Sequence, residues 1–159
     1  MQELTMCKIY LDICCFNRPY DDQAQLKVSL ETQAKLHIQS LVLKKQLELT
    51  WSYVLAFENS RSIFEAKRKA IARWEAISSC FVGRSDDLVA VAKSIVATGV
   101  KEMDALHIAS AITAGCDYFI SVDRRACKYK DKRIRICNPI EFVQEYGGDS
   151  HDEPSGVDR

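Results

Sequence analysis

Four acidic residues stand out in this sequence because their neighbours are apolar. Asp12 lies inside the run KIYLDICC, Asp123 ends the run DYFISVD, and Glu58 lies on an apolar helical stripe. Asp104 begins DALHIASAITA, which is the most apolar helical segment of the chain. A buried carboxylate is costly unless it is paired or binds a metal ion. These four positions are therefore the first candidates for chemistry.

Each acid also has an ordinary structural interpretation, since Asp12 and Asp123 could cap the next segment, Glu58 could reach water, and Asp104 could be a helix N-terminal acid. Four converging carboxylates, however, would repel one another and raise one another's pKa values. Mg²⁺ and Mn²⁺ prefer carboxylate oxygen and water, and two such ions ~4 Å apart activate water and stabilise the leaving oxygen of a phosphodiester. The four acids therefore predict metal-dependent phosphodiester hydrolysis, in which they are the metal ligands and the catalytic residues.

Alternating strands and helices are expected to position these acids. The pattern predicts strands at residues 8–15, 46–50, 117–123 and 133–137. It predicts helices that begin at Asp21 and Asp22, within 51–80 with a break near 59–62, and at 86–98, 104–114 and 140–146. In the first helix, the apolar stripe is Leu26, Leu30, Ala34 and Leu41. This order predicts a three-layer α/β/α sandwich around a central, mainly parallel sheet, whose ligands bind beyond the carboxyl ends of the strands.

The bulk properties indicate one ordinary domain. The chain has 159 residues, so residues 1–147 are expected to fold as one domain and the polar residues 148–159 to form a disordered tail. No apolar run approaches the ~20 residues that span a bilayer, and the first residues lack the features of a signal peptide. The seven cysteines form no C-x-x-C pair, which favours free thiols in a reducing cytoplasm over a zinc site.

The motifs around the four acids resemble those of the PIN-domain nucleases, a family that includes the VapC-type toxins of bacterial toxin–antitoxin pairs. IYLDICCFNRPYDDQ resembles the first strand with its acid, and SYVLAFENS resembles the helix with the second acid. KEMDALHIASAITAGCDYFISVD resembles the most specific segment of the family, with the third and fourth acids, and CNPIEF resembles its closing proline-containing segment. The resemblance covers about residues 8–142. Two departures are Cys14, where many members have a small hydroxyl residue, and Ser121, where threonine is common.

The resemblance implies a sheet of parallel strands, dependence on Mg²⁺ or Mn²⁺, and endonucleolytic cleavage of RNA. It also implies a homodimer and a partner antitoxin protein, because toxin members commonly dimerise and are silenced by a partner.

Basic residues for RNA binding are expected in residues 124–135, RRACKYKDKRIR, where seven of twelve residues are basic. The formal net charge of the chain is zero, so contact with a polyanion must use a local patch of this kind. Arg124, Arg125 and Lys128 are the candidates beside Asp123, and Arg18 is a second candidate near Asp12. The alternative is a solvated loop and edge strand, where lysine is common.

Three other polar residues lie near the acids in sequence. Asn17 and Ser121 are candidates to orient a carboxylate or a metal-bound water. His107 lies one helical turn after Asp104, and a hydrogen-bonded core histidine is the preferred interpretation over a role beside the metal.

Two classes of aspartate-based α/β phosphotransferase fit this sequence less well. A haloacid-dehalogenase-like phosphotransferase needs a second aspartate where Cys14 stands, and a response-regulator receiver needs an acid pair and a later lysine that have no counterpart here. The remaining alternative is a PIN-like RNA-binding or scaffold module with little catalytic activity, and the presence of all four acids argues against it.

Overall fold

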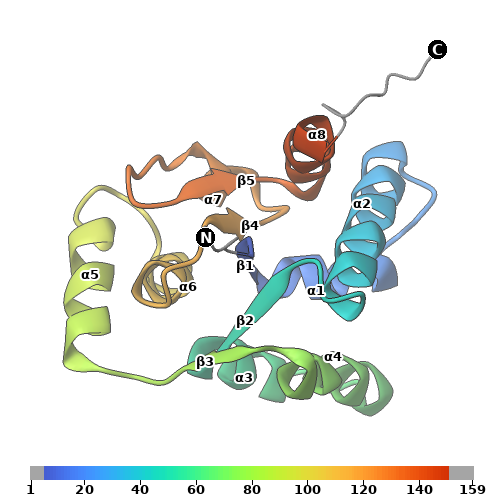
Figure 1. Ribbon diagram of the computed structural model, residues 1–159. Coiled ribbons are helices and arrows are strands. Elements are labelled where there is room, and N and C mark those ends of the chain that lie inside the picture. The colour runs from blue at the N-terminus through green and yellow to red at the C-terminus, as the bar shows by residue number, and fades with distance from the viewer. Residues whose placement is uncertain (1–5, 151–159) are drawn as a thin grey trace.

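A single parallel sheet forms the middle layer of the molecule (Figure 1), in a computed structural model that describes residues 6–150. Its strands are β1 (Lys8–Leu11), β2 (Glu48–Ser52), β3 (Cys80–Val82), β4 (Tyr118–Ile120) and β5 (Arg135–Cys137). The strand order is β3-β2-β1-β4-β5, and every neighbouring pair is parallel. β1 is therefore central, and its carboxyl end lies between those of β2 and β4.

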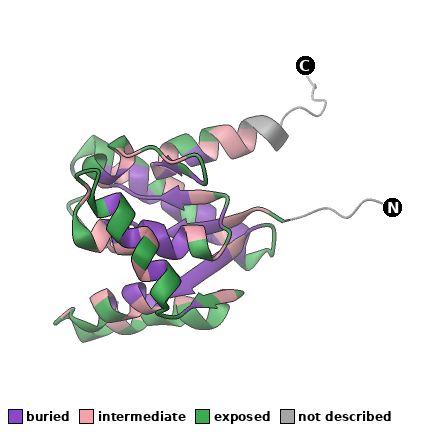
Figure 2. Ribbon diagram, turned by 90° about the vertical axis from the view of Figure 1, so that its left-hand side faces the viewer, coloured by how far each residue is buried: buried purple, intermediate pink, exposed green. Residues whose placement is uncertain are grey.

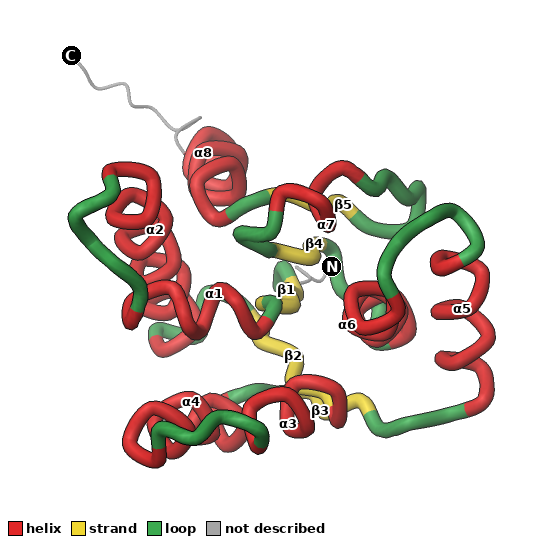
Figure 3. The backbone as a smooth tube through the Cα atoms, turned by 180° about the vertical axis from the view of Figure 1, so that it is seen from behind, coloured by secondary structure: helices red, strands yellow, loops and turns green. Residues whose placement is uncertain are grey.

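Helices cover both faces of this sheet. They are α1 (Ile13–Asn17), α2 (Leu26–Leu43), α3 (Tyr53–Ser60), α4 (Glu65–Ile77), α5 (Asp86–Val96), α6 (Glu102–Thr113), α7 (Arg124–Lys128) and α8 (Pro139–Ser150), with a 3-10 turn, η1, at Arg18–Tyr20. α5 and α6 pack on one face, while α1, α2, α4 and α8 lie on the other (Figures 1 and 3). The predicted three-layer α/β/α sandwich with a parallel sheet is confirmed.

The strands of the central sheet are largely buried between the helices (Figure 2). Ile9, Tyr10 and Leu11 of β1 are completely buried, as expected for a strand covered on both faces. The Tyr10 ring stacks on Phe119 of β4, with 5.5 Å between ring centroids. The middle of the sheet is therefore a rigid platform for the residues that follow its strands.

The first predicted strand is too long, because β1 ends at Leu11 rather than at Cys15. The Asp12 side chain accepts a hydrogen bond from the Ile13 N–H and caps α1, so the chain leaves the sheet at the acid itself. The short strand β3 was not predicted, and Trp51 belongs to β2 instead of to the helix of Glu58. That helix, α3, begins after Ser52, whose side chain caps it.

The predicted apolar stripe of the first long helix is wrong at Leu26 and Leu30, whereas Leu41 is buried as predicted. α2 starts at Leu26 rather than near Asp21, and the Leu26 and Leu30 side chains are exposed. Its buried face carries the polar residues Glu31, Thr32, Lys35 and Gln39 beside Val28, Ile38, Leu41 and Val42. Ion pairing allows this arrangement, because the buried carboxylate of Glu31 lies against the guanidinium of Arg18.

The last helix is longer than expected. α8 covers the predicted residues 140–146 but continues to Ser150, into the segment expected as a tail. The rest of that expected tail, residues 151–159, lies outside the described residues. All seven cysteines are free thiols, and none of the described helices is long and apolar enough to cross a membrane.

Candidate functional site

Two of the predicted acids lie side by side at the carboxyl edge of the sheet. Leu11 of β1 pairs with Ile120 of β4, so Asp12 and Asp123 follow neighbouring strands. Ser121 links them, because its hydroxyl donates to Asp12 Oδ2 at 2.9 Å and accepts the Asp123 N–H at 3.0 Å. This candidate orienting residue therefore fixes the distance between the two strand-end acids.

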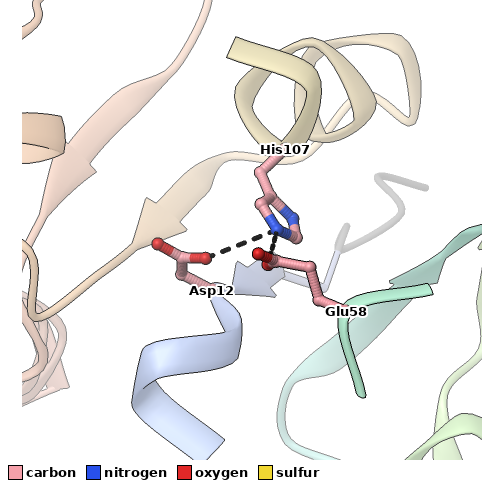
Figure 4. A group of neighbouring side chains, drawn as sticks. All are labelled: Asp12, Glu58 and His107. Atoms are coloured by element: carbon pink, nitrogen blue, oxygen red, sulfur yellow. Dashed lines mark hydrogen bonds and ion pairs between the residues drawn. The ribbon is translucent and has the colours of Figure 1, made fainter. Parts of the chain in front are cut away.

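Glu58 and His107 reach the same edge from two helices. The distance from His107 Nε2 to Glu58 Oε1 is 2.6 Å, and to Asp12 Oδ1 it is 3.7 Å. The three side chains point toward one another, and one ligand atom from each lies within 4.8 Å of the others (Figure 4). His107 and Asp12 are almost completely buried, whereas the Glu58 side chain is 26% exposed. The group is thus open to solvent on its Glu58 side.

A chain of hydroxyl groups holds the imidazole of His107 in place. The Tyr10 hydroxyl lies 2.6 Å from His107 Nδ1 and 2.6 Å from Ser52 Oγ, and Ser52 Oγ accepts the Leu55 N–H that begins α3. When Tyr10 donates to Nδ1, the Nε2–H of neutral His107 donates to Glu58. The helix cap, the phenol, the imidazole and the carboxylate are therefore one connected network.

Asp104 stands in the electrostatic field of the other acids. Burial raises the pKa of Asp104, and the nearby carboxylates of Asp12, Asp123 and Glu58 raise it further. Burial alone would lower the pKa of His107, but Asp12 and Glu58 outweigh burial, so that pKa is raised. Within residues 6–150, no lysine or arginine forms an ion pair with any of the four acids. The site therefore carries an excess of negative charge that the described side chains do not balance.

Two features of this arrangement differ from the sequence-based picture. The tight group is Asp12, Glu58 and His107, while Asp104 and Asp123 lie around it. His107 is buried as expected, but the interpretation as a core histidine missed its contacts with two acids. Its position one turn after Asp104 was the available signal, because residues three apart share a face of a helix.

A large basic pocket adjoins the acids on the Asp104 side. Its volume is about 660 Å³, and its lining includes Asp104 together with Lys101, Arg125, Lys128 and Lys130. Arg125 and Lys128 are thus near the site as predicted, and Lys101 joins them from the start of α6. Arg124 is exposed but does not line this pocket.

Two other candidate residues, Arg18 and Asn17, do not line this basic pocket. The Arg18 guanidinium contacts Asp21 at 3.0 Å and the buried Glu31 at 3.2 Å, so its charge is already neutralised within the fold. Asn17 lines a second, smaller pocket beside Glu58. Cys14, at the position where the resembling family often has a hydroxyl, places its thiol 3.4 Å from Asp12 Oδ2.

Comparisons with known proteins find similarity in structure only. No protein-family model matches the sequence, and no curated protein sequence matches it. A chain of the VapBC2 structure from Rickettsia felis, bound to a DNA fragment from their promoter, matches with a TM-score of 0.52 and 11% identity, over 82% of this chain and 98% of that chain. A chain of DNA-bound VapBC from Salmonella typhimurium matches with a TM-score of 0.49 and 15% identity, over 84% and 99%.

The first of these similarities covers most of both chains. At this level of identity, what the similarity shows is the arrangement of the backbone. The sheet order and the acids at its carboxyl edge agree with the motifs quoted from the sequence. The chain therefore has the fold of the matched chain of the VapBC2 structure, which is consistent with the PIN-like α/β/α sandwich expected from the sequence.

Proposed function

We propose that this protein is an endoribonuclease that depends on Mg²⁺ or Mn²⁺ and uses Asp12, Glu58, Asp104 and Asp123 as its metal ligands. The observation that supports this proposal best is the convergence of acids without balancing cations. Two carboxylates and an imidazole offer ligand atoms within 4.8 Å of one another, and Asp123 lies close enough, together with Asp12 and Glu58, to raise the pKa of Asp104. Carboxylate oxygens are the donors that these hard cations select.

The residues around the acids orient them for this role. Ser121 and the Ile13 N–H hold the Asp12 carboxylate, and His107 holds Glu58. One oxygen of Asp123 accepts the Arg125 N–H, which leaves its other oxygen available. A bound Mg²⁺ or Mn²⁺ ion would supply the acidity that turns water into a nucleophile and would stabilise the leaving oxygen of the phosphodiester.

The experiment that tests this activity is cleavage of a single-stranded RNA by purified protein with Mn²⁺ or with EDTA. Internal cleavage is expected only with the metal, and it should be lost in Glu58→Gln, which keeps the size of the side chain but removes its charge. Equal cleavage in EDTA would refute the metal dependence. RNA binding without cleavage under any metal would favour the alternative of a binding or scaffold module.

The basic pocket supports RNA as the substrate class. Arg125, Lys128, Lys101 and Lys130 surround a cavity that Asp104 also lines, so a bound phosphate chain would lie beside the acids. With single-stranded RNA, each lost phosphate contact reduces the slope of log affinity against log salt by ~0.7. Replacing Arg124, Arg125 and Lys128 by alanine should flatten this slope by about two units if all three contact phosphates. An unchanged slope would show that these residues form a solvated surface.

The remaining parts of the proposal concern partners and location. The similar Rickettsia felis structure is a VapBC2 complex, which supports an antitoxin protein as the partner of this chain. A homodimer and a cytoplasmic location complete the proposal, and the seven free thiols agree with a reducing compartment. Size measurement of the protein alone and with the product of the neighbouring gene tests both assemblies.

A further inference from the structure

A second pocket adjoins the acids at Glu58, which forms part of its wall. Its volume is about 310 Å³. The other side chains that matter here come from α1, from the turn after α3 and from the start of α4: Asn17, Arg61, Phe64 and Lys67. Each of the two pockets thus includes one of the four acids in its lining, but the linings differ in their other residues.

Exposed aromatic rings give this second pocket its character. Phe64 is 63% exposed and the neighbouring Tyr20 is 53% exposed, although both are large enough to be buried in a core. The Lys67 ammonium lies 5.4 Å from the Tyr20 ring centroid and 5.8 Å from that of Phe64. Phe64 and Lys67 therefore give this pocket an exposed apolar ring and a positive charge, and Tyr20 contacts the same lysine from outside the pocket lining.

The polar groups of the pocket are available for a ligand. Across residues 6–150, the Asn17 amide makes no hydrogen bond, and neither Arg61 nor Lys67 forms an ion pair. An amide offers both donors and an acceptor, which suits the edge of a nucleobase. The free cations suit the phosphates on either side of that base.

We propose that this pocket binds one unpaired nucleobase of the RNA, next to the phosphodiester that lies at the acids. The base stacks on Phe64, its edge meets Asn17, and Arg61 and Lys67 neutralise the adjoining phosphates. Bases in a duplex are stacked and paired, so only a single strand or a loop can place a base here. This inference rests on the proposed nuclease function and adds to it a binding site for one base beside the acids.

A protein segment is a less suitable occupant of the same surface. The pocket shares Glu58 with the acidic cluster, and its opening carries two cations and a free amide in addition to its apolar surface. Stacking on aromatic rings beside cations is the usual means by which proteins hold single-stranded nucleic acid.

The test is a binding measurement without cleavage, in EDTA, by fluorescence anisotropy of a labelled single-stranded RNA. Phe64→Ala should weaken binding about tenfold, as expected for the loss of one stacked base. Phe64→Tyr, which keeps the ring, should bind as the native protein does. The slope of log affinity against log salt should stay unchanged in Phe64→Ala, because no phosphate contact is lost.

Phe81→Ala is the matched control. Phe81 is 53% exposed on the edge strand β3 and lies outside the pocket, so its loss should not affect binding. A duplex of the same sequence should bind native protein and Phe64→Ala equally. Native-like binding of single-stranded RNA by Phe64→Ala would overturn the inference, and so would an equal loss in Phe81→Ala.

Failure of this inference is distinguishable from failure of the proposed function. If Phe64→Ala binds normally and the native protein still cleaves RNA with Mn²⁺, only the base pocket is refuted. If the native protein neither binds nor cleaves RNA, both proposals fail. A loss of binding to Phe64→Ala that Asn17→Ala reproduces for some bases and not for others would add that the amide selects the base.

Discussion

Two groups of buried charged residues, one on the buried face of α2 and one at the carboxyl edge of the central sheet, have different electrostatic partners. Beneath α2, the carboxylate of Glu31 is 1% exposed, and it contacts Arg18 at 3.2 Å and Lys27 at 4.0 Å. At the carboxyl edge of the sheet, no lysine or arginine among residues 6–150 forms an ion pair with Asp12 or its neighbouring acids, and the imidazole of His107 contacts Asp12 and Glu58. The first group is balanced and serves the fold, whereas the second retains a charge that a ligand must balance.

This difference indicates which of the many acids in a chain belong to a functional site. A buried acid with its own cation indicates structure, and a buried acid without one indicates a binding site.

The largest effect is expected on catalysis. Asp104→Asn removes a charge that a metal ion would need, so RNA cleavage with Mn²⁺ should fall at least a hundredfold, or ~2.7 kcal/mol. Glu31→Gln, measured well below its melting temperature, should cleave within about twofold of the native protein, since Glu31 lies away from the acids. The initial rates at which the two variants cleave one RNA measure both effects. Near-native cleavage by Asp104→Asn would show that Asp104 is not part of the catalytic site.

A metal ion should stabilise the native fold only by binding at the acidic site. At a Mn²⁺ concentration a hundredfold above its Kd, the native fold gains ~2.7 kcal/mol, which raises the Tm by roughly 7 °C for a chain of this size. EDTA should reverse the shift, Asp12→Asn should abolish it, and Glu31→Gln should keep it. Thermal unfolding with and without metal checks this, and a shift of the same size in Asp12→Asn would contradict it.

Removing the charge of Glu31 should lower the stability of the fold instead of the rate of RNA cleavage. Glu31→Gln leaves Arg18 without its buried partner and should reduce the free energy of unfolding by about 2 kcal/mol, less than for a fully buried pair because Arg18 is 19% exposed. The control is Glu65→Gln, whose exposed partner is Lys69 and whose loss should cost under ~0.5 kcal/mol. Urea titrations measure both, and equal midpoints would argue against a structural role for Glu31.

The smallest effect concerns the metal-free protein. Because the pKa of Asp104 is raised in the fold, its ionised form opposes folding above that pKa, and the penalty vanishes at acid pH where the carboxyl is protonated in both states. Asp104→Asn in EDTA should therefore be more stable than the native protein at neutral pH, by less than ~1 kcal/mol after screening by water. The gain should disappear below about pH 4, the ordinary range of aspartate. A gain independent of pH would point to a cause other than charge.

The strand-end acids could be located from the sequence because their surroundings are local. Asp12 and Asp123 end apolar runs, and parallel topology brings neighbouring strand ends together whatever the details of packing. The spacing DALH placed His107 on the face of Asp104, but the partner across the sheet is set by how α3 and α6 approach each other. No local sequence pattern predicts how these two helices pack, so the contact of His107 with Glu58 is seen only in the structure.

The buried face of α2 shows the opposite case, in which local pattern misleads. Hydrophobic periodicity assigned Leu26 and Leu30 to the core, yet Glu31 and Lys35 occupy it. Burial lowers the pKa of Lys35 to about 8, which shows how strongly the fold resists this charge. Glu31 is accommodated in the core because Arg18, from another segment, pairs with it, and a single-sequence pattern does not identify such a partner.

The order of the strands also decides when the site first exists during synthesis. β1 leaves the ribosome early, but Ile9 pairs with Tyr118, so its neighbour β4 arrives only after most of the chain. At ~5–20 residues per second, several seconds separate the translation of Asp12 from that of Asp123. A nascent chain therefore lacks the complete acidic cluster until Asp123 has been translated, and the proposed activity cannot appear before that point.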